Sequence, residues 1–268
     1  MYNKIIHKIA DSVYNPDIVR VDTSKILNIK RSVSTKIVSK DQKEVNHVRA
    51  LIEASIQFNF WYGTSNFRPN NVDSLWLNNM FDNIFEKIDL YDIYDTKELV
   101  IFSLMNSGIT YLEKRIEYIE EVYLFLKKHI LTYAFYNNDP IMSLKMIKSI
   151  PLFSDDLFLK KGLYAIHKST RLNNLSNSLP VPADYQIPKI LRHFGVLEYK
   201  DSLCEKIEDD VILLQGSKEE VSIRSATILA CSKLAEENSI TPQEVDTWLF
   251  KQKSQIKDKH HLCNTTWY

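Results

Sequence analysis

The chain has 268 residues, of which 44% are hydrophobic and 25% are charged, and its 34 basic and 34 acidic residues give a formal net charge of zero. This composition is ordinary for a globular protein with a substantial core. A neutral chain lacks the basic surface that binds polymeric nucleic acid, so we expect no DNA or RNA partner.

The cysteines and the apolar runs argue against disulfide-rich, zinc-binding and membrane-spanning proteins. Cys204, Cys231 and Cys263 are scattered and lack a paired spacing, which argues against a disulfide framework and against a structural zinc site. No run reaches the ~18 consecutive apolar residues of a membrane-spanning helix. The N-terminus has no signal-peptide core. We therefore expect a cytoplasmic protein with no membrane partner, no metal and no cofactor.

Glycine is rare, with 5 residues in the chain. The sequence contains no Gly-x-Gly-x-x-Gly, no phosphate-binding loop motif and no nucleophile elbow, which excludes most nucleotide folds built on glycine-rich turns. Alternating strand patterns bounded by Asn-Gly or Asp-Gly turns are also missing. Helical periodicity is plentiful, so we predict an all-α protein with about ten helices.

The densest aromatic run is Phe58, Asn59, Phe60 and Trp61. Its rings offer flat faces on which a nucleobase can stack, and Asn59 can donate and accept hydrogen bonds at the edge of the base. An aromatic run in a helical protein is more often core, and from these residues alone core is the better interpretation. A polar loop is expected soon afterwards, at 66–71.

Four patterns predict individual helices. Between positions 111 and 136, apolar residues recur every three or four positions and form one stripe. Pro188 opens a second helix, which ends at Gly195. A third begins after Ser217, which has Glu three residues later, and a fourth begins after Thr241, which is followed by Pro and has Glu at the third position.

A lysine pair and a long loop lie in the middle of the chain. Lys160 or Lys161 would suit a phosphate, although a solvated helix face is the commoner role of such a pair. The polar segment 173–182 is the best boundary inside a single domain, 1–268, with lobes 1–172 and 183–268.

Asp184 lies between Pro182 and Pro188, just ahead of a predicted helix. Proline restricts the residue before it, so we expect Asp184 in a stiff extended turn. Such a turn fixes the position of a carboxylate at little entropic cost. From the residues alone, an Asp that accepts hydrogen bonds from the amides of its own turn is the better interpretation.

Asp246 lies just over one turn into the last predicted helix, beside Val245 and Trp248. An acid at the edge of an apolar face can line a pocket and acquire a raised pKa. A solvated acid near the positive end of the helix fits equally well. His260 and His261 would suit a phosphate or a metal, but no third ligand stands at a sensible spacing, so no metal site is predicted.

These segments, in this order, resemble the queuosine salvage protein family, the queuosine 5′-phosphate N-glycosylases. The most specific matches are 183–188 and 195–199, which are similar to the family's Ala-Asp-Tyr-Arg-Val-Pro and Gly-x-Leu-x-Tyr. The other matching segments are 58–61, 158–161, 220–224, 245–250, His261 and 267–268.

The resemblance implies a helical protein related in fold to helix-hairpin-helix DNA glycosylases, with two helical lobes around a central pocket. It also implies hydrolysis of queuosine 5′-phosphate, which releases queuine for salvage into tRNA modification. By the same resemblance, Asp184 and Asp246 are the catalytic carboxylates of the pocket. The substrate-binding residues that it implies are Phe58, Asn59, Phe60, Trp61, Lys160, Tyr185, Trp248 and His261.

The proposed chemistry suits these residue types. Cleavage of the glycosidic bond passes through an oxocarbenium-like sugar, which a nearby carboxylate stabilises. A 7-deazaguanine has no N7 to protonate and presents N–H donors along its edge, so an acceptor-only carboxylate is its natural partner. We therefore expect Asp184 and Asp246 to face one cavity, with a ring of Phe58, Phe60 or Trp61 beside them.

Two departures from the family pattern keep other functions open. Pro182 replaces a phenylalanine of many members, which removes one stacking ring. Lys251 stands where members often carry another acid. The alternatives are a queuine- or nucleoside-binding protein of the same fold that has lost catalysis, or a helical interaction module.

Overall fold

The computed structural model describes residues 2–25, 27–30, 37–64 and 67–268. Across these ranges the chain forms twelve α-helices and four short 3₁₀ helices, which confirms the all-α prediction. The α-helices are α1 (Tyr2–Val13), α2 (Lys40–Ser55), α3 (Ser74–Phe85), α4 (Thr96–Met105), α5 (Leu112–Phe135), α6 (Pro140–Ile147), α7 (Pro151–Ser154), α8 (Lys160–Leu172), α9 (Gln186–His193), α10 (Asp201–Glu208), α11 (Lys218–Glu237) and α12 (Pro242–Gln252). The 3₁₀ helices are η1 (Pro69–Asn71), η2 (Asp92–Asp95), η3 (Tyr136–Asn138) and η4 (Lys253–Gln255).

The described strands are short and pair far along the chain. β1 (Val19–Val21) runs antiparallel to β2 (Leu197–Tyr199), with Val19 opposite Tyr199. β3 (Ile212–Leu213) runs parallel to β4 (Leu262–Cys263). With two or three residues in each strand, neither pair forms a layer of its own.

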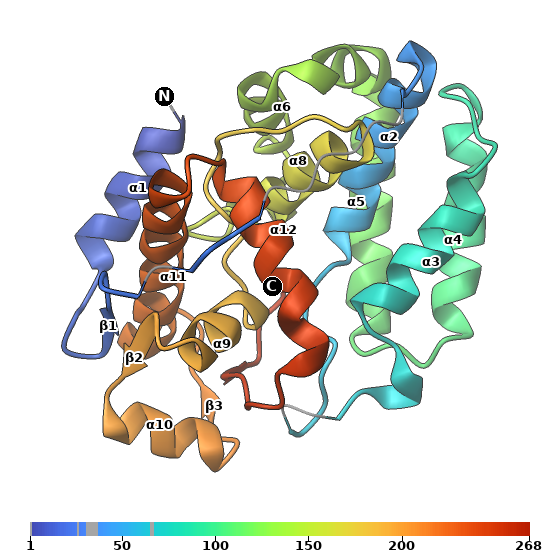
Figure 1. Ribbon diagram of the computed structural model, residues 1–268. Coiled ribbons are helices and arrows are strands. Elements are labelled where there is room, and N and C mark those ends of the chain that lie inside the picture. The colour runs from blue at the N-terminus through green and yellow to red at the C-terminus, as the bar shows by residue number, and fades with distance from the viewer. Residues whose placement is uncertain (1, 26, 31–36, 65–66) are drawn as a thin grey trace.

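Two groups of helices make up the body of the molecule (Figure 1). In one group α2 packs against α5 and α8, and α3 and α4 cover the outer side. In the other group α11 lies between α1 and α12, so the first helix of the chain packs against one of the last. Buried aliphatic and aromatic side chains from both groups form one continuous core. The lobe boundary at 173–182 stays a prediction.

The capping residues predicted from the sequence mark the starts of α11 and α12. α12 begins with a complete capping box, in which Thr241 Oγ1 accepts from the Glu244 amide at 3.3 Å and Glu244 Oε2 accepts from the Thr241 amide at 2.9 Å. Ser217 caps α11 in the same way, accepting from the Glu220 amide at 3.3 Å. The Glu220 carboxylate, however, accepts from the Gly216 amide and so completes no box.

α9 starts two residues before the predicted position. It begins at Gln186 because the Asp184 carboxylate accepts from the first amides of the helix. Pro188 is then the third helical residue, where a missing N–H costs nothing because the first four N–H groups lack helical partners. The end of α9 is as predicted: Gly195 has φ +70°, and its neighbour Val196 donates to the Leu191 carbonyl at 2.9 Å.

The apolar stripe predicted within 111–136 is only partly the buried face of α5. Ile119 and Leu126 are buried, but Leu112 is only partly buried, and Arg115 and Val122 are buried in the core. The pattern missed Arg115 because its burial depends on carbonyl groups of a distant segment. None of the helices in the described ranges has the length and apolar composition needed to cross a bilayer.

Candidate active site

One pocket, with about 750 Å³ of space including the part open to solvent, collects side chains from segments far apart in the sequence. Its lining residues are Gln57, Phe58, Phe60, Arg68, Asp73, Ser74, Asn78, Lys160, Tyr164, Arg171, Pro182, Asp184, Tyr185, Gln186, Ile187, Asp246, Phe250, Lys253 and Tyr268.

Helical spacing explains which side chains of α8 and α12 reach the pocket. Lys160, Tyr164 and Arg171 are four and seven positions apart, so they share one face of α8. On α12, Asp246 and Phe250 are four positions apart and also share a face. The two helices thus present one stripe each to the same cavity.

Asp184 lies on the pocket in the turn before α9. Its Oδ1 accepts from the backbone amides of Gln186 at 2.7 Å and Ile187 at 3.4 Å. These bonds fix the orientation of the carboxylate, as the turn interpretation required. Asp184 also lines the pocket, so the two interpretations offered for it are compatible.

Asp246 lies on the same pocket but in a different environment. Its side chain is buried, and burial raises the pKa of Asp246 from the ordinary 3.8 to about 7. The Asp184 carboxylate raises this pKa further, whereas Arg171 and Lys160 oppose the shift. The carboxyl groups of Asp184 and Asp246 thus interact, as the shared-cavity hypothesis requires.

Lys160 extends from the first turn of α8 into the pocket. Its Nζ donates to the Gln57 carbonyl at 2.7 Å. Burial lowers the pKa of Lys160, and the charge of Asp184 partly offsets this. The lysine is therefore a buried pocket cation and not the solvated one that its sequence context favoured.

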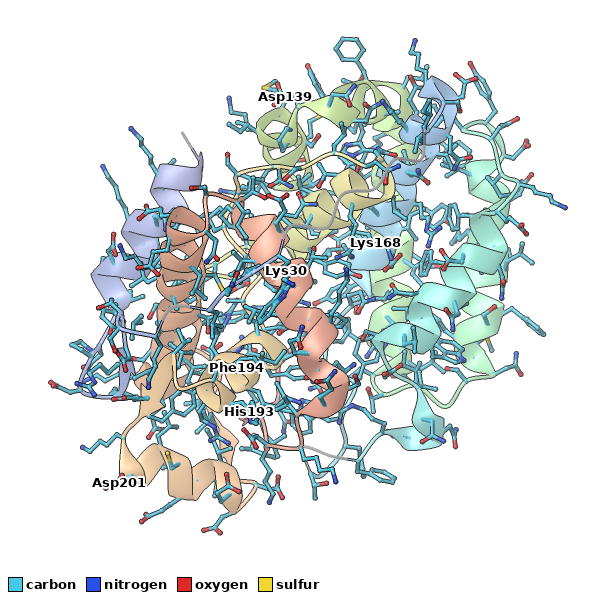
Figure 2. The ribbon with its side chains drawn as sticks, viewed as in Figure 1. Lys30, Asp139, Lys168, His193, Phe194 and Asp201 are labelled. Carbon is cyan, nitrogen blue, oxygen red and sulfur yellow. The ribbon has the colours of Figure 1, made fainter. Side chains whose placement is uncertain are left out.

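Glu53, a second buried acid, bonds to residues of α8, one of which lines the pocket. Tyr164 donates its hydroxyl to Glu53 Oε1 at 2.8 Å, and Lys168 Nζ lies 3.0 Å from the same oxygen. Lys168, labelled in Figure 2, also donates to Asn78 Oδ1 at 2.9 Å. Since Tyr164 and Asn78 line the pocket, this network fixes both side chains.

Phe58 and Phe60 supply the aromatic faces of the pocket. The Arg115 guanidinium lies over both rings, 4.2 Å from the centre of Phe58 and 4.9 Å from that of Phe60. It donates to the carbonyls of Ile56, Phe58 and Asn59. Arg115 thereby holds the backbone of the aromatic run, which turns through a left-handed Asn59 (φ 38°).

Four of the expected binding residues lie away from the pocket lining. Asn59 is buried, and its Nδ2 donates to the Tyr111 hydroxyl at 3.3 Å. Trp61 packs in a small apolar cluster with Leu262 and with the lining residues Tyr185 and Tyr268, but does not itself line the pocket. Because Trp248 is two positions from Asp246, it points to the other side of α12 and packs on Phe194, which Figure 2 shows at the end of α9.

His261 is the fourth of these residues. Its Nε2 lies 3.3 Å from the Tyr268 hydroxyl, and burial holds the pKa of His261 well below its usual range. The ring is therefore neutral and supports Tyr268, which does line the pocket. Within the described ranges, no three His, Cys, Asp or Glu side chains gather as metal ligands would.

Cations gather where the pocket meets the loop that precedes α3. Arg68 and Lys253 line this part, and Lys253 Nζ lies 3.5 Å from Asp73 Oδ2. Burial, followed by the charges of Lys253 and Arg68, lowers the pKa of Lys189 to about 8. Lys253 and Arg68 thus both lie close enough to disfavour the charge on Lys189, which Asp258 and Asp184 partly offset, and a cluster of cations of this kind favours a nearby anion.

Sequence reasoning missed several residues of the lining. Tyr164 and Arg171 were predictable in principle, because they follow Lys160 at helical spacing. Tyr268 stood only in a segment of the family resemblance, and Arg68 had no signal, since only the tertiary fold brings their segments to α8.

Comparisons with known proteins agree with the resemblance. Residues 152–268 match the family model described as queuosine salvage protein. A queuosine 5′-phosphate N-glycosylase/hydrolase of Mus musculus is 34% identical over 80 residues, which cover 27% of this chain and 24% of the relative. The proteins of that name from Dictyostelium discoideum (31% over 94 residues, 32% of this chain and 29% of the relative) and Sphaerobacter thermophilus (40% over 52 residues, 19% and 16%) are also similar.

Each of these matches covers less than a third of the relative's length. The family-model match covers residues 152–268, the part of the chain that carries Lys160, Asp184 and Asp246.

Proposed function

From the similarity of residues 152–268 to the queuosine salvage protein family, we propose that this chain hydrolyses the N-glycosidic bond of queuosine 5′-phosphate and releases queuine. The observation that carries the proposal is the joint lining of one pocket by Asp184, Asp246 and the ring of Phe60. These are the two acids and the stacking face that a 7-deazaguanine nucleotide needs.

The two acids divide the work according to their surroundings. Asp246, with a pKa of about 7, exchanges a proton near neutral pH and hydrogen-bonds the edge of the departing base in either form. Asp184, oriented by two backbone amides, places its charge against the oxocarbenium-like sugar and aligns water. Two carboxyl groups in unlike environments are a familiar basis for such a division.

The remaining lining positions the substrate. Phe58 and Phe60 stack on the base, and base–aromatic stacking supplies ~1–3 kcal/mol per base. Lys160 and Tyr185 contact the substrate beside the two acids. Arg68, Lys253 and the adjacent Lys189 take the 5′-phosphate, because this is the cationic part of the pocket.

The proposal concerns a small-molecule substrate, with no polymeric nucleic acid, no membrane and no cofactor involved. We place the activity in the cytoplasm. The free thiols of Cys204, Cys231 and Cys263 are compatible with a reducing compartment.

Single-turnover release of free base from queuosine 5′-phosphate tests the proposal, with wild type beside Asp184→Asn. The substitution keeps the Oδ1 acceptor of the turn but removes the charge. We expect a rate lower by ~10²–10³-fold and a melting temperature close to that of wild type. Asp209→Asn, an exposed acid at the end of α10, is the control and should leave both unchanged.

An intact rate in Asp184→Asn with a lowered melting temperature would make Asp184 a turn residue only. A wild type that binds queuine in a thermal-shift assay but releases no base would support the non-catalytic binding protein. Lys251 is exposed on α12 at the position where the family resemblance implies a further acid, and this departure is the feature that favours the second function.

A further inference from the structure

Arg224 of α11 is fully buried and bonds to two other segments of the chain and to Glu220 on its own helix. Its Nε donates to the Ala183 carbonyl at 3.0 Å, which is the residue before Asp184. Its Nη2 lies 2.6 Å from Asp156 Oδ2, and its Nη1 lies 3.2 Å from Glu220 Oε1. The planar guanidinium thus fixes the geometry of three acceptors at once.

Asp156 connects Arg224 to the backbone amide of Lys160. Leu159 precedes α8 in a left-handed conformation (φ 54°) and has no polar side chain to cap the helix. Asp156 supplies the cap from three residues further back, since its Oδ2 accepts from the Lys160 amide at 2.8 Å. The same oxygen binds Arg224, so the start of α8 and α11 share one carboxylate.

The face of the guanidinium makes a third connection to the pocket. Arg224 lies 4.6 Å from the ring centre of Tyr268 and 4.9 Å from that of Phe158. Tyr268 is a pocket wall. Arg224 lies outside the lining, yet it contacts the ring of Tyr268 directly. Through Ala183 and Asp156 it is also connected to Asp184 and Lys160.

We propose that Arg224 is a positioning residue of the pocket, which sets the place of the Asp184 turn relative to Lys160 on α8. The inference rests on the proposed function, because only in an active site does the relative position of these two charges matter. Arg224 touches no substrate in this scheme. It acts through the Ala183 carbonyl and through Asp156.

Arg224→Lys separates positioning from charge. Lysine keeps the cation but cannot reach three acceptors with a rigid fork. Misplacement of reacting groups by about 1 Å costs up to ~10²-fold in rate, so we expect kcat for base release to fall about 10- to 100-fold while KM changes less than about threefold. Asp156→Asn should give the same split between kcat and KM.

Amide hydrogen exchange gives a readout that is independent of activity. In Arg224→Lys, we expect roughly tenfold faster exchange at the amides of Gln186 and Lys160, which bond to Asp184 and Asp156, and no change in α12. Arg192→Lys is the matched control, since Arg192 is partly buried, contacts Glu208 and the Lys259 carbonyl, and lies outside the pocket. It should leave kcat and the exchange of both amides unchanged.

The outcomes are distinct. An unchanged kcat in Arg224→Lys, or exchange that rises equally in α12 and at the two amides, would overturn the positioning role and leave Arg224 a core residue. A wild type that releases no base would remove the proposed function. The local exchange pattern would still decide whether Arg224 holds the Asp184 turn and the start of α8.

Discussion

Asp246→Asn is expected to stabilise the protein above neutral pH while abolishing base release. Burial raises the pKa of Asp246 to about 7, so the folded state holds a proton that the unfolded state releases near pH 4. A raised folded-state pKa means that the stability it confers is full below pH 4 and is lost as the pH rises through 7. Asparagine has the size of the neutral acid and does not titrate.

The magnitude follows from the separation of the two pKa values. They differ by about three pH units, and each unit corresponds to about 1.36 kcal/mol, so the ionised side chain costs the folded state up to about 4 kcal/mol at pH 8. The unfolding free energy of Asp246→Asn should therefore match that of wild type at pH 4. Its advantage should then grow to about 4 kcal/mol by pH 8, because only the wild-type side chain ionises.

Urea unfolding followed by circular dichroism at pH 4, 5, 6, 7 and 8 measures this difference directly. Asp209→Asn, which removes an exposed acid at the end of α10, is measured beside it as the matched control. A constant offset between Asp246→Asn and wild type across the pH series would refute the reasoning, because it would mean that Asp246 ionises alike in the folded and unfolded states.

Three further substitutions test the surroundings of the acids. Arg171→Gln should move the midpoint of this pH dependence upward, because Arg171 stabilises the ionised Asp246; the same urea series measures it, and a midpoint that stays or falls would contradict the assignment. Phe60→Leu should raise KM for the nucleotide by about tenfold through lost stacking, whereas Trp61→Phe should alter only the melting temperature; equal KM effects would return both residues to core packing. Lys253→Ala should raise KM for the 5′-phosphate but not for the free nucleoside, and a parallel rise for both would place the phosphate elsewhere.

Features that depend on neighbours in sequence were predictable. Thr241, Pro242 and Glu244 lie within one turn of each other, so they mark the start of α12 whatever packs against it. Gly195 ends α9 for a similar reason, because only its local backbone conformation is involved. The all-α class follows from many such signals together with the scarcity of glycine.

The lining of the pocket was decided by tertiary structure. The aromatic run was predictable, but Phe58 and Phe60 face the pocket while Trp61 does not. That difference depends on the bonds from Arg115 to backbone carbonyls in and just before the run, which lie between 56 and 59 positions earlier in the chain. Asp246 had two equally good interpretations, since a helix acid is buried or solvated according to the elements that pack beside it. Burial and the charges of Asp184 and Arg171 set its pKa, and no local pattern specifies contacts between residues so far apart in the chain.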